Sequence, residues 1–259
     1  MNHDSIRDIN DWTHIADFWD EQVADGSDFQ RSLVFPATDQ LLIPATDQTI
    51  LDCCCGNGNY ARRLARLGCE VVAFDGSVRM IELAKARSDG LAIDYHTLDA
   101  TDEMAMQQGL GGLTFDAAVC SMAMMDLPTI APLLASVRRL LKPAGRFVFS
   151  VGHPSFHTNE AQMLAVQDHG QGTPTQEFSV LVKRYLSDWP HQSRGLLDQP
   201  RPHTIYHRSL TSLLAECFKA GFVVTGLLEP AFDPETRLRS PFSWARRPEI
   251  PPVLVVRLS

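Results

Sequence analysis

The stretch that decides the fold is residues 49–61, which read TILDCCCGNGNYA. Its apolar start predicts the end of a buried strand. Gly56 and Gly58 then allow a tight turn and a close approach of a ligand to the backbone. After the turn, apolar residues recur at helical spacing: Tyr60, Ala61, Leu64, Ala65 and Leu67. We expect the basic residues of that helix on its opposite face: Arg62, Arg63 and Arg66. A strand, a glycine turn and a helix N-terminus form a typical nucleotide pocket.

Two kinds of ligand fit this turn. Residues 56–61 match the dinucleotide pattern G-x-G-x-x-G/A, and the acidic residue Asp75 follows about 20 residues later, as that pattern requires. This favours a nicotinamide-dependent oxidoreductase. Asp52 lies four residues before Gly56, and a carboxylate there suits a ligand with an ammonium group better than a pyrophosphate. Asp52 therefore favours a cationic cofactor.

Residues 50–58 resemble the first motif of the class I S-adenosylmethionine-dependent methyltransferases, which is an apolar strand, an acidic residue and a Gly-Cys-Gly-x-Gly turn. Cys54 stands where that family has its first Gly. Residues 141–146 are similar to the family's leucine-lysine-proline-glycine-glycine turn, with Ala144 in place of one Gly. The resemblance implies an α/β, Rossmann-like fold: a seven-stranded, mostly parallel sheet with helices on both faces and an antiparallel C-terminal hairpin.

Composition limits the class of protein. The chain has 259 residues, a net charge of −8 and a pI of about 5.5, which disfavours a nucleic-acid partner. Residues 1–5 are polar and begin no signal peptide, and no apolar run has the length of a membrane span. We interpret the six cysteines as reduced, small hydrophobic residues of a cytoplasmic protein, because no C-x-x-C pair suggests zinc. The expected partner is a small molecule, with no nucleic acid, membrane or metal.

Further strands and helices follow the glycine turn. We expect strands at residues 70–75, 92–97, 114–120, 146–151, 222–228 and 253–258, and amphipathic helices at residues 130–141 and 209–220. The chain then divides into an N-terminal helical lid at 1–45, a cofactor-binding core at 46–151, a substrate-cap insertion at 152–207, and a helix with strands that complete the core at 208–259. The N-terminal segment has an alternative role as a packing helix at the sheet edge.

The resemblance implies S-adenosyl-L-methionine as cofactor and assigns roles to residues. Asp75 would bind the ribose hydroxyls, while Ser77 is better placed than Asp75 to cap the next helix. We prefer Asp99 over Asp102 as partner of the adenine amino group, although either could cap a helix. Ser121 and Met122 would meet the sulfonium side. The full set of expected cofactor residues is Trp19, Arg31, Asp52, Cys53, Cys54, Gly56, Gly58, Asp75, Gly76, Met80, Asp99, Ala100, Ser121 and Met122.

The insertion is rich in histidine. Six of the nine histidines fall in it: His153, His157, His169, His191, His203 and His207. His153 directly follows a predicted strand, so we name it as the candidate catalytic base, with a structural hydrogen bond to a loop carbonyl as the alternative. Tyr206 and His207 are weaker candidates. Asp126, two residues before Pro128, is expected to cap a helix, with a substrate-facing role as the alternative.

The motifs together predict transfer of a methyl group to a small-molecule acceptor by in-line displacement, in which proximity and orientation carry most of the rate. Two alternatives stay open. One is an NAD(P)-dependent oxidoreductase. The dinucleotide pattern favours it, and the absence of a Tyr-x-x-x-Lys pair argues against it. The other is a catalytically inactive cofactor-binding module.

Overall fold

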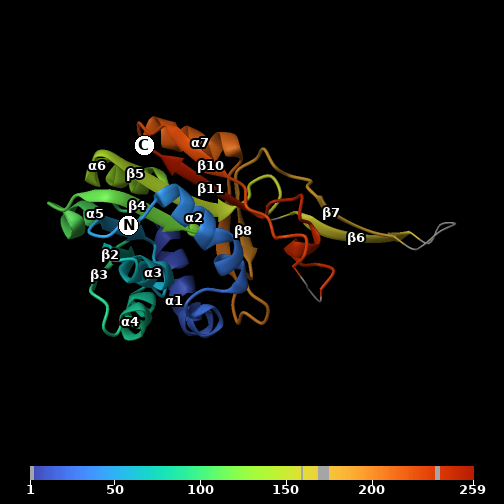
Figure 1. The fold of residues 1–259 in the computed structure, drawn as a ribbon, viewed down its shortest axis with the longest axis horizontal. Helices are drawn as coiled ribbons and strands as arrows, with labels where there is room; N and C mark the ends of the chain where they lie inside the picture. Colours follow the sequence, from blue (N-terminus) through green and yellow to red (C-terminus); the bar gives the residue numbers. More distant parts are fainter. Residues whose placement is uncertain (1–2, 159, 169–174, 237–239) are drawn as a thin grey trace.

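The computed structural model describes residues 3–158, 160–168, 175–236 and 240–259. His169 and the first two residues of the polar N-terminus lie outside these ranges. One sheet has the strand order β10-β11-β5-β4-β1-β2-β3 (Figure 1). Its strands are β1 (Thr49–Cys53), β2 (Glu70–Asp75), β3 (Ile93–Thr97), β4 (Phe115–Ser121), β5 (Leu141–Gly152), β10 (Val224–Leu228) and β11 (Val253–Leu258).

The sheet is mostly parallel. β1 pairs in parallel with β2 and β4, and the outer pairs β2–β3 and β4–β5 are parallel as well. β11 lies antiparallel between β5 and β10. The fold class predicted from the motifs is therefore confirmed, including the antiparallel C-terminal pair. β1 lies in the middle of the sheet, so the glycine turn that follows it sits at the centre of the carboxyl edge, where open α/β sheets bind ligands.

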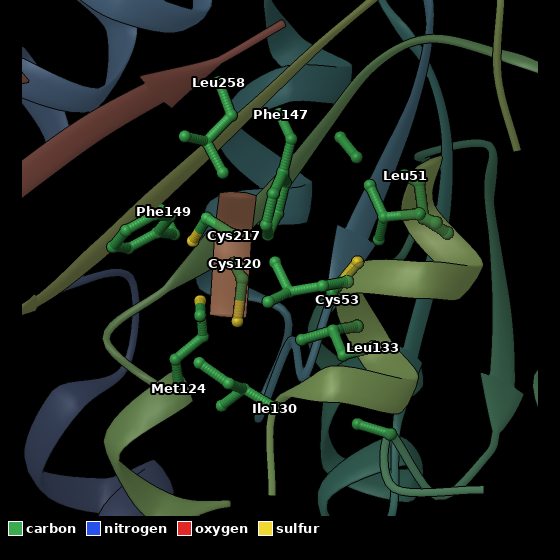
Figure 2. Packing of buried hydrophobic residues seen from close by; sticks show 14 of the residues in the cluster. Leu51, Cys53, Cys120, Met124, Ile130, Leu133, Phe147, Phe149, Cys217 and Leu258 are labelled. Carbon is green, nitrogen blue, oxygen red and sulfur yellow. The ribbon is translucent and has the colours of Figure 1, made fainter. Parts of the chain in front are cut away.

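Helices cover both faces of the sheet. They are α1 (His3–Val23), η1 (Gln30–Val34), α2 (Phe35–Leu42), α3 (Asn59–Arg66), α4 (Val78–Arg87), α5 (Glu103–Leu110), η2 (Met124–Asp126), α6 (Ala131–Leu140), α7 (Leu210–Lys219) and η3 (Trp244–Arg246). Buried side chains of α5, α6 and α7 pack on one face, together with Leu51 and Cys53 of β1 (Figure 2). Side chains of α2, α3 and α4 pack on the other face with Ile50. Successive strand residues thus alternate between two cores.

Two local predictions are confirmed and one is wrong. Ser77 caps α4, because its Oγ accepts the N–H of Met80 at 3.3 Å. All six cysteines are free thiols. Arg62, expected on the exposed face of α3, is instead fully buried. The segment that follows α1 covers this side of α3, and the Arg62 guanidinium donates to the Asp25 carboxylate at 2.7 Å.

The insertion contains two antiparallel hairpins that the sequence did not predict: β6 (Gln162–Asp168) with β7 (Thr175–Leu181), and β8 (Trp189–Ser193) with β9 (His203–His207). The β6–β7 hairpin projects away from the body of the molecule (Figure 1). β9 packs against α1 and η2, so the second hairpin lies over the edge that carries the glycine turn. Within the described ranges, no helix is both long and apolar enough to span a bilayer.

Candidate functional site

The glycine turn is fastened to the neighbouring strand. The N–H of Cys55 donates to the carbonyl of Phe74, and the N–H of Gly56 donates to Oδ2 of Asp75, both at 2.9 Å. Gly58 has a φ of +74°, and a Cβ there would lie 2.3 Å from the hydroxyl of Tyr95. Gly56 has a φ of +54°, and its missing Cβ would point into open space. The turn therefore leaves room for a ligand beside Gly56.

Asp75 ends β2 with both carboxylate oxygens engaged. Oδ2 accepts from Gly56, and Oδ1 accepts the N–H of Ser77 at 2.9 Å. Burial raises the pKa of Asp75, and these two backbone donors oppose that rise. Each carboxylate oxygen has a second lone pair. The side chain can thus hold the turn and still accept hydrogen bonds from ribose hydroxyls, and its role in ribose binding remains a prediction.

Asp52 is a buried carboxylate with an unpaired oxygen. Its side chain is 1% exposed, and no group of the described residues bonds Oδ2. Burial and, to a smaller extent, the charge of Asp75 raise the pKa of Asp52 to about 8. A hydrogen bond from the backbone of Ala61 lowers this pKa by less. Ser121 Oγ, at the end of β4, is also buried without a partner in the described part of the chain. Buried polar atoms normally have partners, so these two fit a polar ligand that enters at the turn.

The predicted adenine end lies after β3. Asp99 is 6% exposed, and its carboxylate accepts from the hydroxyls of Ser5 at 2.6 Å and Thr101 at 2.8 Å. Ala100 is buried nearby in the chain, and Met80 of α4 is 4% exposed. The rival residue Asp102 caps α5, since its Oδ1 accepts the N–H of Ala105 at 3.0 Å. This placement leaves Asp99 as the carboxylate that faces inward.

Helix α1 lies across the carboxyl ends of three strands. Its Ser5 bonds Asp99 after β3, its Thr13 bonds Ser77 after β2 at 2.9 Å, and its Asp20 accepts from Asn57 after β1 at 2.9 Å. A Cβ on Gly76 would lie 2.9 Å from Ile9 of the same helix. The N-terminal segment thus covers the predicted cofactor edge, and its function as a lid remains a prediction.

Other expected cofactor residues are placed differently. Trp19 packs edge-on against Trp12, with ring centroids 5.2 Å apart, and its Nε1 donates to Gln199 at 3.1 Å. Arg31 has a 58% exposed side chain, and its guanidinium pairs with Asp28 at 2.9 Å. The structure therefore does not bring the Arg31 guanidinium to the buried carboxylates. The thiol of Cys53 lies in the core, so only the backbone of Cys53 can meet a ligand at the turn.

A cavity of about 310 Å³ lies where the two hairpins of the insertion meet η2 and the end of β5. Its lining combines apolar and imidazole side chains, including Met124, Met163, His191, His207 and Trp244. None of the expected cofactor residues lines it, and neither does His153. This cavity is therefore separate from the cofactor edge and has the size of a small-molecule pocket.

His153 is buried, with both ring nitrogens engaged. The ring is 2% exposed, Nδ1 accepts the N–H of Ser155 at 3.1 Å, and Nε2 lies 2.8 Å from Oε1 of Glu229. Nδ1 is thus the unprotonated nitrogen and Nε2–H donates to Glu229. Burial lowers the pKa of His153, and Glu229 partly offsets this. This arrangement resembles the structural alternative, and the catalytic role of His153 remains a prediction.

Asp126 does not cap a helix, so that expectation is wrong. The N-cap of α6 is Ile130, with no side-chain cap bond. The Asp126 carboxylate turns inward, where its Oδ1 lies 3.8 Å from Nε2 of His203. Burial, followed by the charges of Asp8 and Asp75, raises the pKa of Asp126 well above its usual value.

Comparisons with known proteins agree with this geometry. Residues 50–145, from β1 into β5, match the family model described as "Methyltransferase domain". Residues 50–145 thus match a methyltransferase domain. The matched methyltransferase domain holds the glycine turn, Asp75, Asp99 and Ser121, and this match favours the methyltransferase interpretation over the oxidoreductase one.

Curated relatives match this chain over part of its length. The ubiquinone biosynthesis O-methyltransferase of Histophilus somni (strain 2336) is 31% identical over 109 residues, which cover 41% of this chain and 46% of that protein. The enzyme of the same name from Cereibacter sphaeroides (strain ATCC 17025 / ATH 2.4.3) is 34% identical over 136 residues, covering 52% and 50%. The chain thus spans about half the length of these relatives or less.

A solved structure extends the likeness in fold beyond the methyltransferase domain. The S-adenosylmethionine-dependent methyltransferase from Mesorhizobium loti has a TM-score of 0.65 and 24% identity, covering 86% of this chain and 96% of that one. At this identity, the likeness shows a shared fold.

Sequence reasoning missed several residues around the methyltransferase domain. Asn57 was passed over within the glycine motif, although its side chain holds α1 through Asp20. Gln199 and the Asp126–His203 pair were also missed. Gln199 is bonded to a residue 180 positions away, so no local pattern could signal its role.

Proposed function

We propose that this protein transfers the methyl group of S-adenosyl-L-methionine to a small-molecule acceptor. The observation that carries the proposal is the group of buried and half-buried carboxylates Asp52, Asp75 and Asp126. Burial raises the pKa of each, and the charge of Asp75 further raises those of Asp52 and Asp126. No cation of the described residues lowers any of these three pKa values. A ligand with a positive sulfonium and a positive ammonium group relieves this repulsion, whereas the pyrophosphate of a nicotinamide cofactor adds to it.

Each part of the cofactor has a proposed partner. The unpaired Oδ2 of Asp52 would take the ammonium group, and Asp75 would accept from the ribose hydroxyls. Asp99, with Ala100 and Met80, would border the adenine. Ser121 and Met122 would border the sulfonium. The further members proposed on the resemblance are Trp19, Arg31, Cys53, Cys54, Gly56, Gly58 and Gly76, of which Arg31 must leave Asp28 to take part.

The acceptor would occupy the cavity beneath the cap hairpins. Its volume of about 310 Å³ suits a small molecule. The curated relatives are named O-methyltransferases, which agrees with a small acceptor. In-line displacement requires mainly that the acceptor atom and the methyl carbon be held in line. We further propose that the protein acts in the cytoplasm, without a nucleic-acid or membrane partner, because its net charge is −8 and its cysteines are free.

The proposal is tested by comparing thermal unfolding in the presence of S-adenosylmethionine, S-adenosylhomocysteine, NAD and NADP. A ligand that binds only the folded protein raises the melting temperature, by an amount that corresponds to about 2.7 kcal/mol at a hundredfold excess over its Kd. We expect a rise with the two adenosyl amino acids alone. A rise with NAD or NADP alone would favour an oxidoreductase. Binding of S-adenosylmethionine without methyl transfer to any of a broad set of small acceptors would favour an inactive module.

A further inference from the structure

The side-chain amide of Gln199 determines where His203 carries its proton. Gln199 is 2% exposed. One end of its amide receives the N–H of Trp19 and the N–H of Gly195, each at 3.1 Å. Both partners can only donate, so this end is the oxygen. The other end is the NH₂ group, which donates to the carbonyl of Arg201 and to Nδ1 of His203, the latter at 3.1 Å.

His203 is therefore a donor through Nε2. A ring whose Nδ1 accepts a hydrogen bond carries its proton on Nε2 when neutral. Burial lowers the pKa of His203 to about 4, so the neutral form prevails near pH 7. Nε2–H faces Oδ1 of Asp126 at 3.8 Å, which is too long for a direct hydrogen bond. A single oxygen atom beside this gap can accept from Nε2–H and donate its own proton to Oδ1, and a hydroxyl group does both.

The pair lies between the acceptor cavity and the cofactor edge. His203 belongs to β9, and Ile205, Tyr206 and His207 of the same strand line the cavity. Ser193, opposite His203 on β8, lines it too. On the other side, Asp126 is within electrostatic range of Asp75 at the end of β2. An acceptor that reaches from the cavity toward the cofactor edge thus passes this pair.

We propose that Asp126 and His203 together bind a hydroxyl group of the acceptor, and that Asp126 takes the proton of that hydroxyl during transfer. This inference rests on the proposed methyltransferase function and makes the acceptor an alcohol or a phenol. The O–H bond breaks and its proton moves to the Asp126 carboxylate. The oxygen forms a bond to the methyl carbon as the carbon–sulfur bond breaks, and its electron pair stays on sulfur as a neutral thioether. His203 Nε2–H holds the oxygen in place, and Gln199 positions His203.

The proton position of His203 is measurable without any ligand. A long-range ¹H–¹⁵N correlation spectrum of histidine-labelled protein distinguishes the two neutral tautomers, and His203→Gln identifies the signal. We expect the Nε2–H form in the wild type. Gln199→Glu replaces the donating NH₂ with an accepting oxygen and should convert His203 to the Nδ1–H form. A wild-type ring protonated on Nδ1, or a tautomer that Gln199→Glu leaves unchanged, would overturn the inference.

Phenol and anisole test the hydroxyl site, because they differ only in the hydroxyl proton and its methyl replacement. Binding of each to the protein loaded with S-adenosylhomocysteine is followed by NMR titration. Phenol should bind more tightly than anisole and shift the His203 signal. Asp126→Asn should weaken phenol binding about tenfold, with anisole unaffected, because a buried acceptor is replaced by a group that mismatches the donor. With S-adenosylmethionine, the same substitution should slow anisole formation from phenol about a hundredfold or more.

A matched control is the exposed pair of His96 and Asp94 on β3, whose Nε2 and Oδ2 lie 2.9 Å apart. Asp94→Asn should change the His96 signal and leave the binding of both probes unchanged. The inference fails if phenol and anisole bind equally, if Asp126→Asn leaves the anisole yield unchanged, or if it weakens S-adenosylhomocysteine as much as phenol. A wild-type protein that binds neither S-adenosylhomocysteine nor S-adenosylmethionine contradicts the proposed function itself. Failure of the hydroxyl site can therefore be distinguished from failure of the methyltransferase proposal.

Discussion

The backbone N–H of Gly56 donates a 2.9 Å hydrogen bond to Oδ2 of Asp75, so the turn after β1 is fastened to the end of β2. The other oxygen of the same carboxylate accepts the N–H of Ser77 at the start of α4. One side chain thus sets the relative position of the glycine turn and the following helix. The same carboxylate is the proposed ribose partner. Its loss would therefore release the glycine turn from β2 and also remove a group that binds the ligand.

We therefore expect Asp75→Ala to abolish measurable binding of S-adenosylhomocysteine in calorimetry. It should also lower the free energy of unfolding by about 1.5–3 kcal/mol, the usual contribution of hydrogen bonds to a charged group. Asp102→Ala is the control, because it removes the N-cap of α5 and leaves the Asp75 bonds to the glycine turn in place. That variant should lose about 1 kcal/mol of stability and keep its affinity. An Asp75→Ala protein with wild-type affinity would contradict the assignment.

Asp52 makes cofactor affinity depend on pH. Its pKa of about 8 in the free protein means that Asp52 is mostly protonated at pH 7. An ammonium group binds the ionised carboxylate, so binding must release this proton. Affinity for S-adenosylhomocysteine should rise from pH 6 to pH 8, by up to about tenfold per unit for a single linked proton. Calorimetry in buffers of different ionisation enthalpy should show proton release, and in Asp52→Asn the release and most of the affinity should disappear.

The same pKa predicts a gain in stability from Asp52→Asn. A carboxyl group whose pKa is raised in the folded protein contributes stability below its unfolded pKa, and this contribution is lost as pH rises through about 8. The asparagine side chain does not ionise, so the variant keeps this stability at high pH. Its melting temperature should exceed that of the wild type at pH 8 and equal it near pH 4. Each kcal/mol corresponds to roughly 2–4 °C for a chain of this size. Equal melting temperatures at both pH values would contradict the raised pKa.

Cys54 occupies a backbone conformation that favours glycine, with a φ of +54°. The left-handed region costs an ordinary residue about 1–2 kcal/mol. Glycine avoids that cost but loses more conformational freedom on folding, by about 0.5–1 kcal/mol. Cys54→Gly should therefore keep or tighten cofactor binding, and should be more stable than Cys54→Ala by up to about 1 kcal/mol. A large loss of affinity in Cys54→Gly, measured beside Cys54→Ala, would show that the turn requires a side chain.

Continuous apolar runs made the sheet predictable from sequence. β2 and β11 have the expected bounds, because parallel and central strands are buried on both faces and read as unbroken runs. Ser77 could be predicted as a cap because an N-cap bond depends on residues three apart. β6 to β9 were missed, since half-exposed hairpin strands carry a weak pattern interrupted by Pro and His.

The site was predictable only where it follows the strands. Asp52 and Asp75 end predicted strands, so their place at one edge of the sheet could be inferred. Arg62 looked like an exposed helical arginine, because nothing near it in sequence shows that residues 24–25 fold over it. Asp126 and His203 meet through contacts between segments 77 residues apart, which neither periodicity nor local motifs encode.

The attachment of α1 to the glycine turn depends on Asp20 more than on any surface ion pair of the same helix. Asp20 is 9% exposed in its side chain, and its carboxylate accepts from Asn57 and from Arg87 at 2.9 and 2.8 Å. Asp17, three residues earlier, pairs with Arg79 but is 64% exposed. Exposed pairs contribute about 0–1 kcal/mol, whereas hydrogen bonds to a buried charge contribute about 1.5–3 kcal/mol.

Asp20→Ala should consequently loosen α1, and Asp17→Ala should not. We expect amide hydrogen exchange in α1 to accelerate about tenfold or more in Asp20→Ala, because the loss of these hydrogen bonds lowers the free energy of local opening. Dissociation of S-adenosylhomocysteine, followed by stopped flow, should accelerate in the same variant, since the proposed ligand leaves past α1. Faster exchange with unchanged dissociation would mean that α1 is a packing helix at the sheet edge, and equal exchange in both variants would mean that Asp20 does not hold it.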